Sequence, residues 1–212
     1  MVWASLGTFL TSPAKEKHWL WLLHRKLLFK TADKRENNKR CRLCNYWEEN
    51  ALHFLGCRGL ASVKNLIYQL LGCMGTSRSD ILSKTSWLTG LDKNHKLIPE
   101  ACRALHRIYI TNVYRNMTLV ITEKVKFNPW RVKQEICRDF MSTLLAYQQE
   151  KHVFSQSRRH TKLQHILPKA AIAQAMPLGN LDAHSGLLSI KPSISKILKR
   201  YKVWTEFTTN EY

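Results

Sequence analysis

The chain has 212 residues, with 34 Lys and Arg against 15 Asp and Glu, which gives a formal net charge of +19. A hydrophobic content of 44% excludes wholesale disorder, and charges interrupt every apolar run well short of the ~18 residues of a membrane-spanning helix. The composition therefore predicts a soluble, strongly basic chain that buries a core without needing disulfides and has no membrane partner.

Residues 1–14 form a predicted N-terminal extension ahead of the first helix. The segment has no basic stretch before its short apolar run, and Lys15 is the first basic side chain. These features favour neither a secretory signal nor a transit peptide, so we expect a protein that is not secreted and lies in the nucleus or the cytoplasm. The six cysteines are then expected to be free thiols or metal ligands.

Two amphipathic helices are predicted in the first third of the chain. Residues 15–30 carry Trp and Leu at helical spacing, and a polar loop follows over 31–40. Residues 60–71 repeat the helical spacing, with Gly72 as the predicted stop signal. With the cysteines between them, the two helices define a predicted module over 15–72.

The middle of the chain is predicted to be a connection followed by a helical segment. Residues 73–98 form the connection, with a short element around Trp87. The helical segment covers 99–154 and holds one helix over 100–124 and another over 130–151. The many β-branched residues of the first of these leave a strand as an alternative.

Residues 155–212 are predicted to be a basic, poorly ordered tail. Prolines and glycines recur between residues 168 and 192 among small side chains, a composition typical of linkers. A short basic helix is expected over 193–204. This region is not expected to join the core.

The most specific motif is a group of cysteines and one histidine between the first two predicted helices. Cys41, Cys44, His53 and Cys57 follow the pattern C-x2-C-x8-H-x3-C. Two cysteines in a tight turn can reach one ion, and the His and Cys share a helix face. Three thiolates and one imidazole suit tetrahedral Zn2+, and a closed set of four indicates a structural ion. The predicted fold is therefore mostly α, with amphipathic helices around a small Cys3His zinc knuckle.

The cysteines also allow other interpretations. C-x2-C occurs in redox pairs, although no thioredoxin-like βαβ pattern is visible here, and isolated core thiols are a further alternative. Cys73, Cys102 and Cys137 have no comparable spacing and are interpreted as buried free thiols. Cys73 could also replace one of the four ligands.

Basic side chains gather before and within the predicted knuckle. Residues 25–42 hold eight of them against two carboxylates. Such a run usually binds phosphates, with a solvated surface as the alternative. Tyr46 and Trp47 either stack on bases or pack on the helices, whereas Phe54 is expected in the core. The predicted nucleic-acid-binding residues are Arg25, Lys26, Lys30, Lys34, Arg35, Lys39, Arg40, Arg42, Arg58, Tyr46 and Trp47.

The region around the knuckle resembles the zinc-binding region C-terminal to the polymerase in non-LTR retrotransposon reverse transcriptases. The resemblance is carried by a Trp- and Leu-rich stretch over 19–28, by Cys41-Arg-Leu-Cys44 and by Glu48-Glu-Asn-Ala-Leu-His-Phe-Leu-Gly-Cys57. It implies the same four zinc ligands. It covers residues 15–72 well and 100–150 loosely, and the gap between His and the last Cys is three residues here, where the family more often has four.

The sequence predicts a zinc-knuckle nucleic-acid-binding module, with RNA or DNA as its partner. It contains no Asp-Asp polymerase motif, Gly-rich phosphate loop, GxSxG or HExxH. We therefore expect no catalysis and no small-molecule substrate, and the resemblance implies a fragment or derivative of a reverse transcriptase without its polymerase. The alternative is a zinc-stabilised helical protein-interaction domain without nucleic-acid binding.

Overall fold

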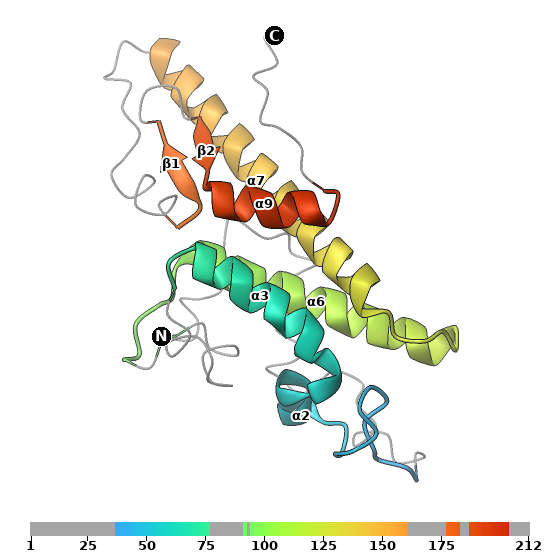
Figure 1. The fold of residues 1–212 in the computed structure, drawn as a ribbon. Helices are drawn as coiled ribbons and strands as arrows, with labels where there is room; N and C mark the ends of the chain where they lie inside the picture. Colours follow the sequence, from blue (N-terminus) through green and yellow to red (C-terminus); the bar gives the residue numbers. More distant parts are fainter. Residues whose placement is uncertain (1–36, 77–90, 93, 161–176, 183–186, 204–212) are drawn as a thin grey trace.

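The computed structural model describes residues 37–76, 91–92, 94–160, 177–182 and 187–203 (Figure 1). The elements in chain order are α2 (Ala51–Gly56), the 3-10 helix η3 (Arg58–Leu60), α3 (Ala61–Cys73), α6 (Glu100–Thr122), α7 (Pro129–His160), β1 (Gly179–Leu181), β2 (Leu188–Ile190) and α9 (Pro192–Arg200). The predicted extension, the helix expected over 15–30 and the element around Trp87 lie outside the described residues. The described part is mostly helical, as predicted.

Helix α3 forms because apolar side chains recur along one of its faces. Val63, Leu66, Ile67 and Leu70 are all buried, at the spacing of an amphipathic helix. The helix ends at Cys73 and not at the predicted stop, Gly72. The left-handed backbone that ends such helices is found instead at Gly75, with φ of +79°.

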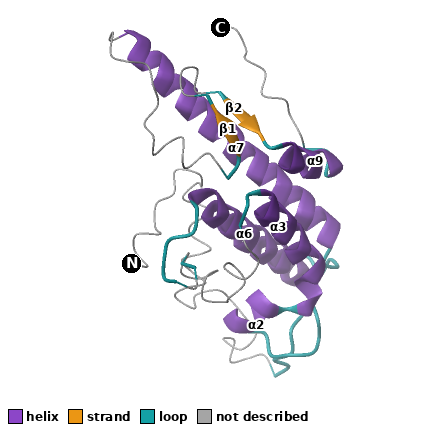
Figure 2. Ribbon diagram, turned by 60° about the vertical axis from the view of Figure 1, so that its left-hand side comes forward, coloured by secondary structure: helices purple, strands orange, loops and turns teal. Residues whose placement is uncertain are grey.

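Helices α6 and α7 form the centre of the molecule and confirm the two helices predicted there. Helix α6 is buried over most of its length, so its β-branched residues pack as helix side chains and the strand alternative is wrong. Helix α7 continues to His160, beyond the predicted end at 151. Figures 1 and 2 show α3 beside α6, with α7 crossing both, and all three contact one another.

Hydrogen bonds between polar side chains fix how α6 lies on α7. Asn112 Nδ2 donates to Asp139 Oδ2 at 2.9 Å, and Asn116 Nδ2 donates to Glu135 Oε2 at 2.5 Å. Both asparagines are buried, so each amide needs the partner that the other helix supplies.

The described parts of the C-terminal region pack on the helices, so the prediction of a tail outside the core is wrong for 177–182 and 187–203. Strands β1 and β2 pair antiparallel, and α9 follows directly. The buried apolar side chains from this region are Leu178, Leu181, Leu188, Ile194, Ile197, Leu198 and Tyr201. Helix α9 confirms the short basic helix expected there.

A close backbone contact and one buried side-chain bond hold the hairpin in place. A Cβ on Gly179 would lie 1.9 Å from the Ser189 carbonyl oxygen, so only glycine allows the strands to approach this closely. The Leu188 backbone N–H donates to Gln148 Oε1 on α7 at 2.6 Å. Among the glycines and prolines that resemble a linker in the sequence, Gly179 therefore allows the close strand pairing, and Pro192 is the first residue of α9. No helix in the described part of the chain is long and apolar enough to cross a membrane.

Candidate metal centre

The first two predicted ligands lie in a tight hairpin turn. Arg40 and Glu48 pair as an antiparallel bridge, and the Cys41 backbone N–H donates to the Trp47 carbonyl at 2.7 Å. The turn closes with Asn45 in a left-handed conformation, with φ of +53°, which Asn tolerates better than most residues. This reversal brings the side chains of Cys41 and Cys44 to the same side.

The other two candidate ligands lie on α2 and directly after it, and α2 begins at a side-chain cap. Asn50 Oδ1 accepts a hydrogen bond from the His53 backbone N–H at 2.9 Å, an arrangement typical of a helix N-terminus. One turn later Cys57 ends the helix, so His53 and Cys57 project from the same face. Phe54 between them is buried, as expected.

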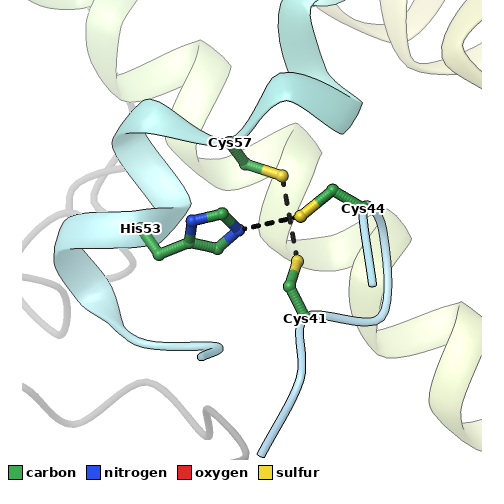
Figure 3. Close-up of side chains that lie close together, drawn as sticks. All are labelled: Cys41, Cys44, His53 and Cys57. Atoms are coloured by element: carbon green, nitrogen blue, oxygen red, sulfur yellow. Dashed lines mark hydrogen bonds between the residues drawn. The ribbon is translucent and has the colours of Figure 1, made fainter. Parts of the chain in front are cut away.

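The four side chains converge on one point (Figure 3). Their ligand atoms all lie within 4.8 Å of one another, with 3.8 Å from Cys41 Sγ to Cys57 Sγ and 3.3 Å from Cys44 Sγ to His53 Nε2. Tetrahedral Zn2+ with its usual bond lengths would place two sulfurs about 3.8 Å apart and sulfur and nitrogen about 3.6 Å apart. The group is therefore positioned to hold a metal ion of this kind, which confirms the predicted Cys3His set.

The thiols of Cys41 and Cys57 share a hydrogen bond, and this contact shifts their pKa values in opposite directions. The hydrogen bond from Cys57, opposed by burial, lowers the pKa of Cys41, while the same bond, together with burial, raises the pKa of Cys57. The Leu43 backbone N–H also points at Cys41 Sγ, 3.4 Å away. Backbone N–H groups aimed at a sulfur support a thiolate, the form that binds a metal.

A buried carboxylate joins the hairpin turn to the segment that leads into α2. The Glu49 side chain is 2% exposed and its Oε1 lies 3.2 Å from Arg42 Nη1, while Oε2 accepts the Arg42 backbone N–H at 2.9 Å. Arg42 is thus held in an ion pair beside the ligands. In the sequence, Glu49 is only part of the stretch that carries the family resemblance, and this contact is not predicted there.

Gly59 lets the two halves of the knuckle approach each other. A Cβ at this position would lie 2.9 Å from the Leu43 carbonyl oxygen and 3.0 Å from Leu43 Cβ, closer than real Cβ atoms come. Gly59 is in η3, and Leu43 is in the turn between Cys41 and Cys44. The sequence offers one signal for this role, since a glycine closely follows the last ligand, but spacing alone does not reveal what it touches.

Two aromatic rings stand out from the surface of the hairpin. Tyr46 and Trp47 are 59% and 62% exposed, and their rings meet edge to face with centroids 5.2 Å apart. The Arg58 guanidinium lies over the Tyr46 ring, 4.6 Å from its centroid. Neither ring is packed into the core.

The basic residues predicted to bind nucleic acid differ in their exposure and contacts. Arg40 and Arg58 are exposed and Lys39 is half-buried, all three near the knuckle. Arg42 contacts Glu49 as described above. Arg25, Lys26, Lys30, Lys34 and Arg35 lie outside the described residues.

The remaining cysteines stay apart from the four ligands. All six cysteines are free thiols. Cys102 and Cys137 are fully buried, as predicted, and burial raises their pKa values to about 11 and about 12. Cys73 is half-buried and is not among the residues that converge on the site.

Comparison of the chain with protein-family models, curated proteins and solved structures finds no match. The family resemblance therefore rests on the motif residues alone, and the description of the site rests on its geometry.

Proposed function

We propose that the chain is a nucleic-acid-binding module whose knuckle is held by Zn2+. The observation that carries the proposal is the exposed pair Tyr46 and Trp47, with Arg58 over one ring, on the hairpin that also holds Cys41 and Cys44. Exposed aromatic rings beside cations suit unpaired bases and their phosphates.

The donor set supports zinc as the ion. Three sulfurs and one imidazole nitrogen form a closed set of four at distances that match tetrahedral coordination, and soft sulfur ligands disfavour Mg2+ and Ca2+. With all three cysteines deprotonated, the ion and its ligands carry a net charge of −1. The centre itself would not attract phosphate, so its role is to hold the hairpin and its exposed rings in place.

The side chains around the candidate metal site have different roles in the proposed binding. The rings of Tyr46 and Trp47 offer stacking surfaces, and Arg40 and Arg58 supply charge at the exposed surface. Arg42 is excluded from this role because its guanidinium pairs with Glu49 and its side chain is only 19% exposed. This arrangement also supports the resemblance of the motif to the zinc-binding region of non-LTR retrotransposon reverse transcriptases, and we propose such an origin, without catalysis, for this chain.

The proposal is tested by measuring binding of a fluorescein-labelled single-stranded RNA and the matching DNA to the zinc-loaded chain at several salt concentrations. Tyr46→Ala with Trp47→Ala should weaken binding by about tenfold or more, since each stacked base contributes about 1–3 kcal/mol. Arg40→Gln with Arg58→Gln should flatten the salt dependence. Cys44→Ser should lower the zinc content and weaken binding.

Leu97→Ala is the matched control, because Leu97 is an apolar side chain that is 46% exposed and lies away from the hairpin. It should bind like the wild type. If all variants bind with wild-type affinity and salt dependence, the nucleic-acid role fails and a zinc-stabilised protein-interaction domain is favoured. If zinc content does not change in Cys44→Ser, the ligand assignment fails.

A further inference from the structure

A second exposed aromatic ring lies where the start of α7 meets the end of α9. Trp130 is 49% exposed, and one side of its ring rests on Tyr201, with centroids 5.0 Å apart and planes tilted by 39°. Tyr201 is 6% exposed, so it supports the indole from below. Two residues about 70 positions apart in the sequence thus form one aromatic pair, and no local sequence motif predicts this contact.

Several exposed cations are close neighbours of these two aromatic residues along the chain. Arg131, beside Trp130, has 56% of its side chain exposed, although Glu135 accepts from its Nε at 3.0 Å. Lys199, Arg200 and Lys202 are exposed around Tyr201. We call these residues, with Trp130, the α7–α9 surface. Lys124 and Lys126 lie close by in the turn that leads into α7, and both are exposed.

Helix capping accounts for only part of this charge. Lys199 and Arg200 occupy the last turn of α9, where cations offset the helix dipole. That effect requires neither Lys202, which lies beyond the helix, nor a half-exposed indole beside Tyr201. An aromatic ring with one open face and a basic border is the arrangement with which proteins bind unpaired nucleotides.

We propose that the α7–α9 surface is a second binding site for single-stranded nucleic acid, separate from the knuckle. A base stacks on the open face of Trp130, and the flanking phosphates pair with Arg200 and Lys202. The inference takes its ligand class from the proposed function, but it does not depend on the metal. In Figures 1 and 2 the α6–α7 turn lies between the end of α9 and the hairpin beside α2, so one strand could follow this side from one site to the other.

The test uses the full zinc-loaded chain, a labelled single-stranded RNA of mixed sequence and the duplex of the same sequence. Trp130→Leu keeps an apolar side chain over Tyr201 but removes the stacking ring, and it should weaken single-strand binding about tenfold while changing duplex binding less than threefold. Leu97→Ala, at a side chain that is 46% exposed in the turn before α6, is the control and should bind as the wild type does.

A second pair of variants tests the phosphate contact with equal charge changes. Lys202→Gln should lower the slope of log affinity against log salt by about 0.7, the value for one phosphate contact on a single strand. Lys96→Gln removes one exposed lysine from the turn before α6 and should leave the slope unchanged. Equal slopes for the two variants would overturn the phosphate assignment.

The outcomes separate this inference from the proposed function. If Trp130→Leu binds within twofold of the wild type while Tyr46→Ala with Trp47→Ala loses binding, the α7–α9 site fails and the knuckle stands. The reverse pattern supports the α7–α9 site and rejects the nucleic-acid-binding role of the knuckle. If Trp130→Leu instead loses binding only to vesicles that contain phosphatidylserine, the surface is a lipid contact and the inference is overturned.

Discussion

Because Gly59 has no Cβ, η3 can lie close to the turn of the candidate metal centre. Because a Cβ there would lie 2.9 Å from the Leu43 carbonyl oxygen, Gly59→Ala must push η3 away from the turn that carries Cys41 and Cys44. We expect the free energy of unfolding to fall by about 1–3 kcal/mol and the zinc affinity to fall by about tenfold or more. Urea unfolding and competition with a chromogenic chelator measure the two effects.

Gly72 provides the control for this substitution. It lies exposed within α3, and a Cβ there would meet nothing within 4 Å. Gly72→Ala should therefore raise stability by about 0.5–1 kcal/mol and leave zinc affinity unchanged. Equal effects of the two substitutions would show that the contact between Gly59 and Leu43 imposes no constraint.

His106 on α6 gives the fold a predictable response to acid. Burial, with a smaller effect from the charge of Arg107, lowers the pKa of His106 from 6.5 to about 3. Between these values the unfolded chain binds a proton that the folded chain does not. Through this residue, stability is constant above about pH 6.5 and falls by about 1.4 kcal/mol per pH unit below it, down to about pH 3.

His106→Gln should remove this part of the pH dependence. Urea unfolding of both proteins at neutral and at mildly acidic pH measures it as a difference, so the titration of the metal ligands, common to both, cancels. Stability should fall more steeply with acid in the wild type than in His106→Gln. Parallel pH profiles for the two proteins would show that His106 becomes protonated without unfolding.

At the residue scale, the sequence predicts the four side chains that converge on the candidate metal site but not the residues that position them. Cys41, Cys44, His53 and Cys57 are visible because metal geometry restricts their spacing. Glu49 and Gly59 act through contacts between the turn and the helical half of the knuckle, and neither contact follows from separation along the chain. Trp130 was missed for the same reason, since its partner, Tyr201, comes from another element.

At the element scale, the hairpin β1–β2 holds α9 in the core through one glycine. Gly179→Ala places a Cβ 1.9 Å from the Ser189 carbonyl oxygen, so the strands must separate. We expect a loss of about 2–3 kcal/mol in stability and faster amide exchange in α9. Asn180→Ala, at an exposed position of the same strand, should cost much less. Unchanged exchange in α9 would show that the helix packs independently of the hairpin.

The long helices could be predicted because they repeat an apolar spacing over several turns. Helices α3, α6 and α7 were predicted to within a few residues at most of their ends, and the last extends further because amphipathic spacing fades before the helix does. Strands of three residues are too short for an alternating pattern. The glycine of β1 and the nearby prolines therefore indicated a linker, and the burial of α9 was not predicted.

At the scale of the whole molecule, the core is much larger than the metal centre. The buried cluster runs from Cys41 to Tyr201 and includes α3, α6, α7 and α9. Removing zinc with a chelator should therefore disorder the Arg40–Glu48 hairpin and the rest of the knuckle, but it should leave most of the helical circular dichroism signal in place. Binding that depends on Tyr46 and Trp47 should be lost at the same time. Cooperative loss of the whole helical signal on chelation would show instead that the helical core also depends on the metal.

The charge of +19 is also distributed differently from what the sequence suggests. Arg42, inside the dense basic run, is neutralised by Glu49, while Arg200 and Lys202, from the supposed tail, stand exposed beside Trp130. Net charge by segment therefore does not predict which cations are exposed. The three-dimensional structure decides which cations reach the surface beside an aromatic ring.

The 3.8 Å contact between the sulfurs of Cys41 and Cys57 predicts which disulfide would form if the metal-free protein were oxidised by air. These two sulfurs belong to different halves of the knuckle, so a disulfide between them would cross-link the Arg40–Glu48 hairpin to the residue after α2. Cys44 and His53 would remain as half a site, unable to hold zinc tightly. A bound ion would thus protect the thiols as well as hold the turn, and a preparation that loses its metal without a reductant present would not regain it when the metal is added back.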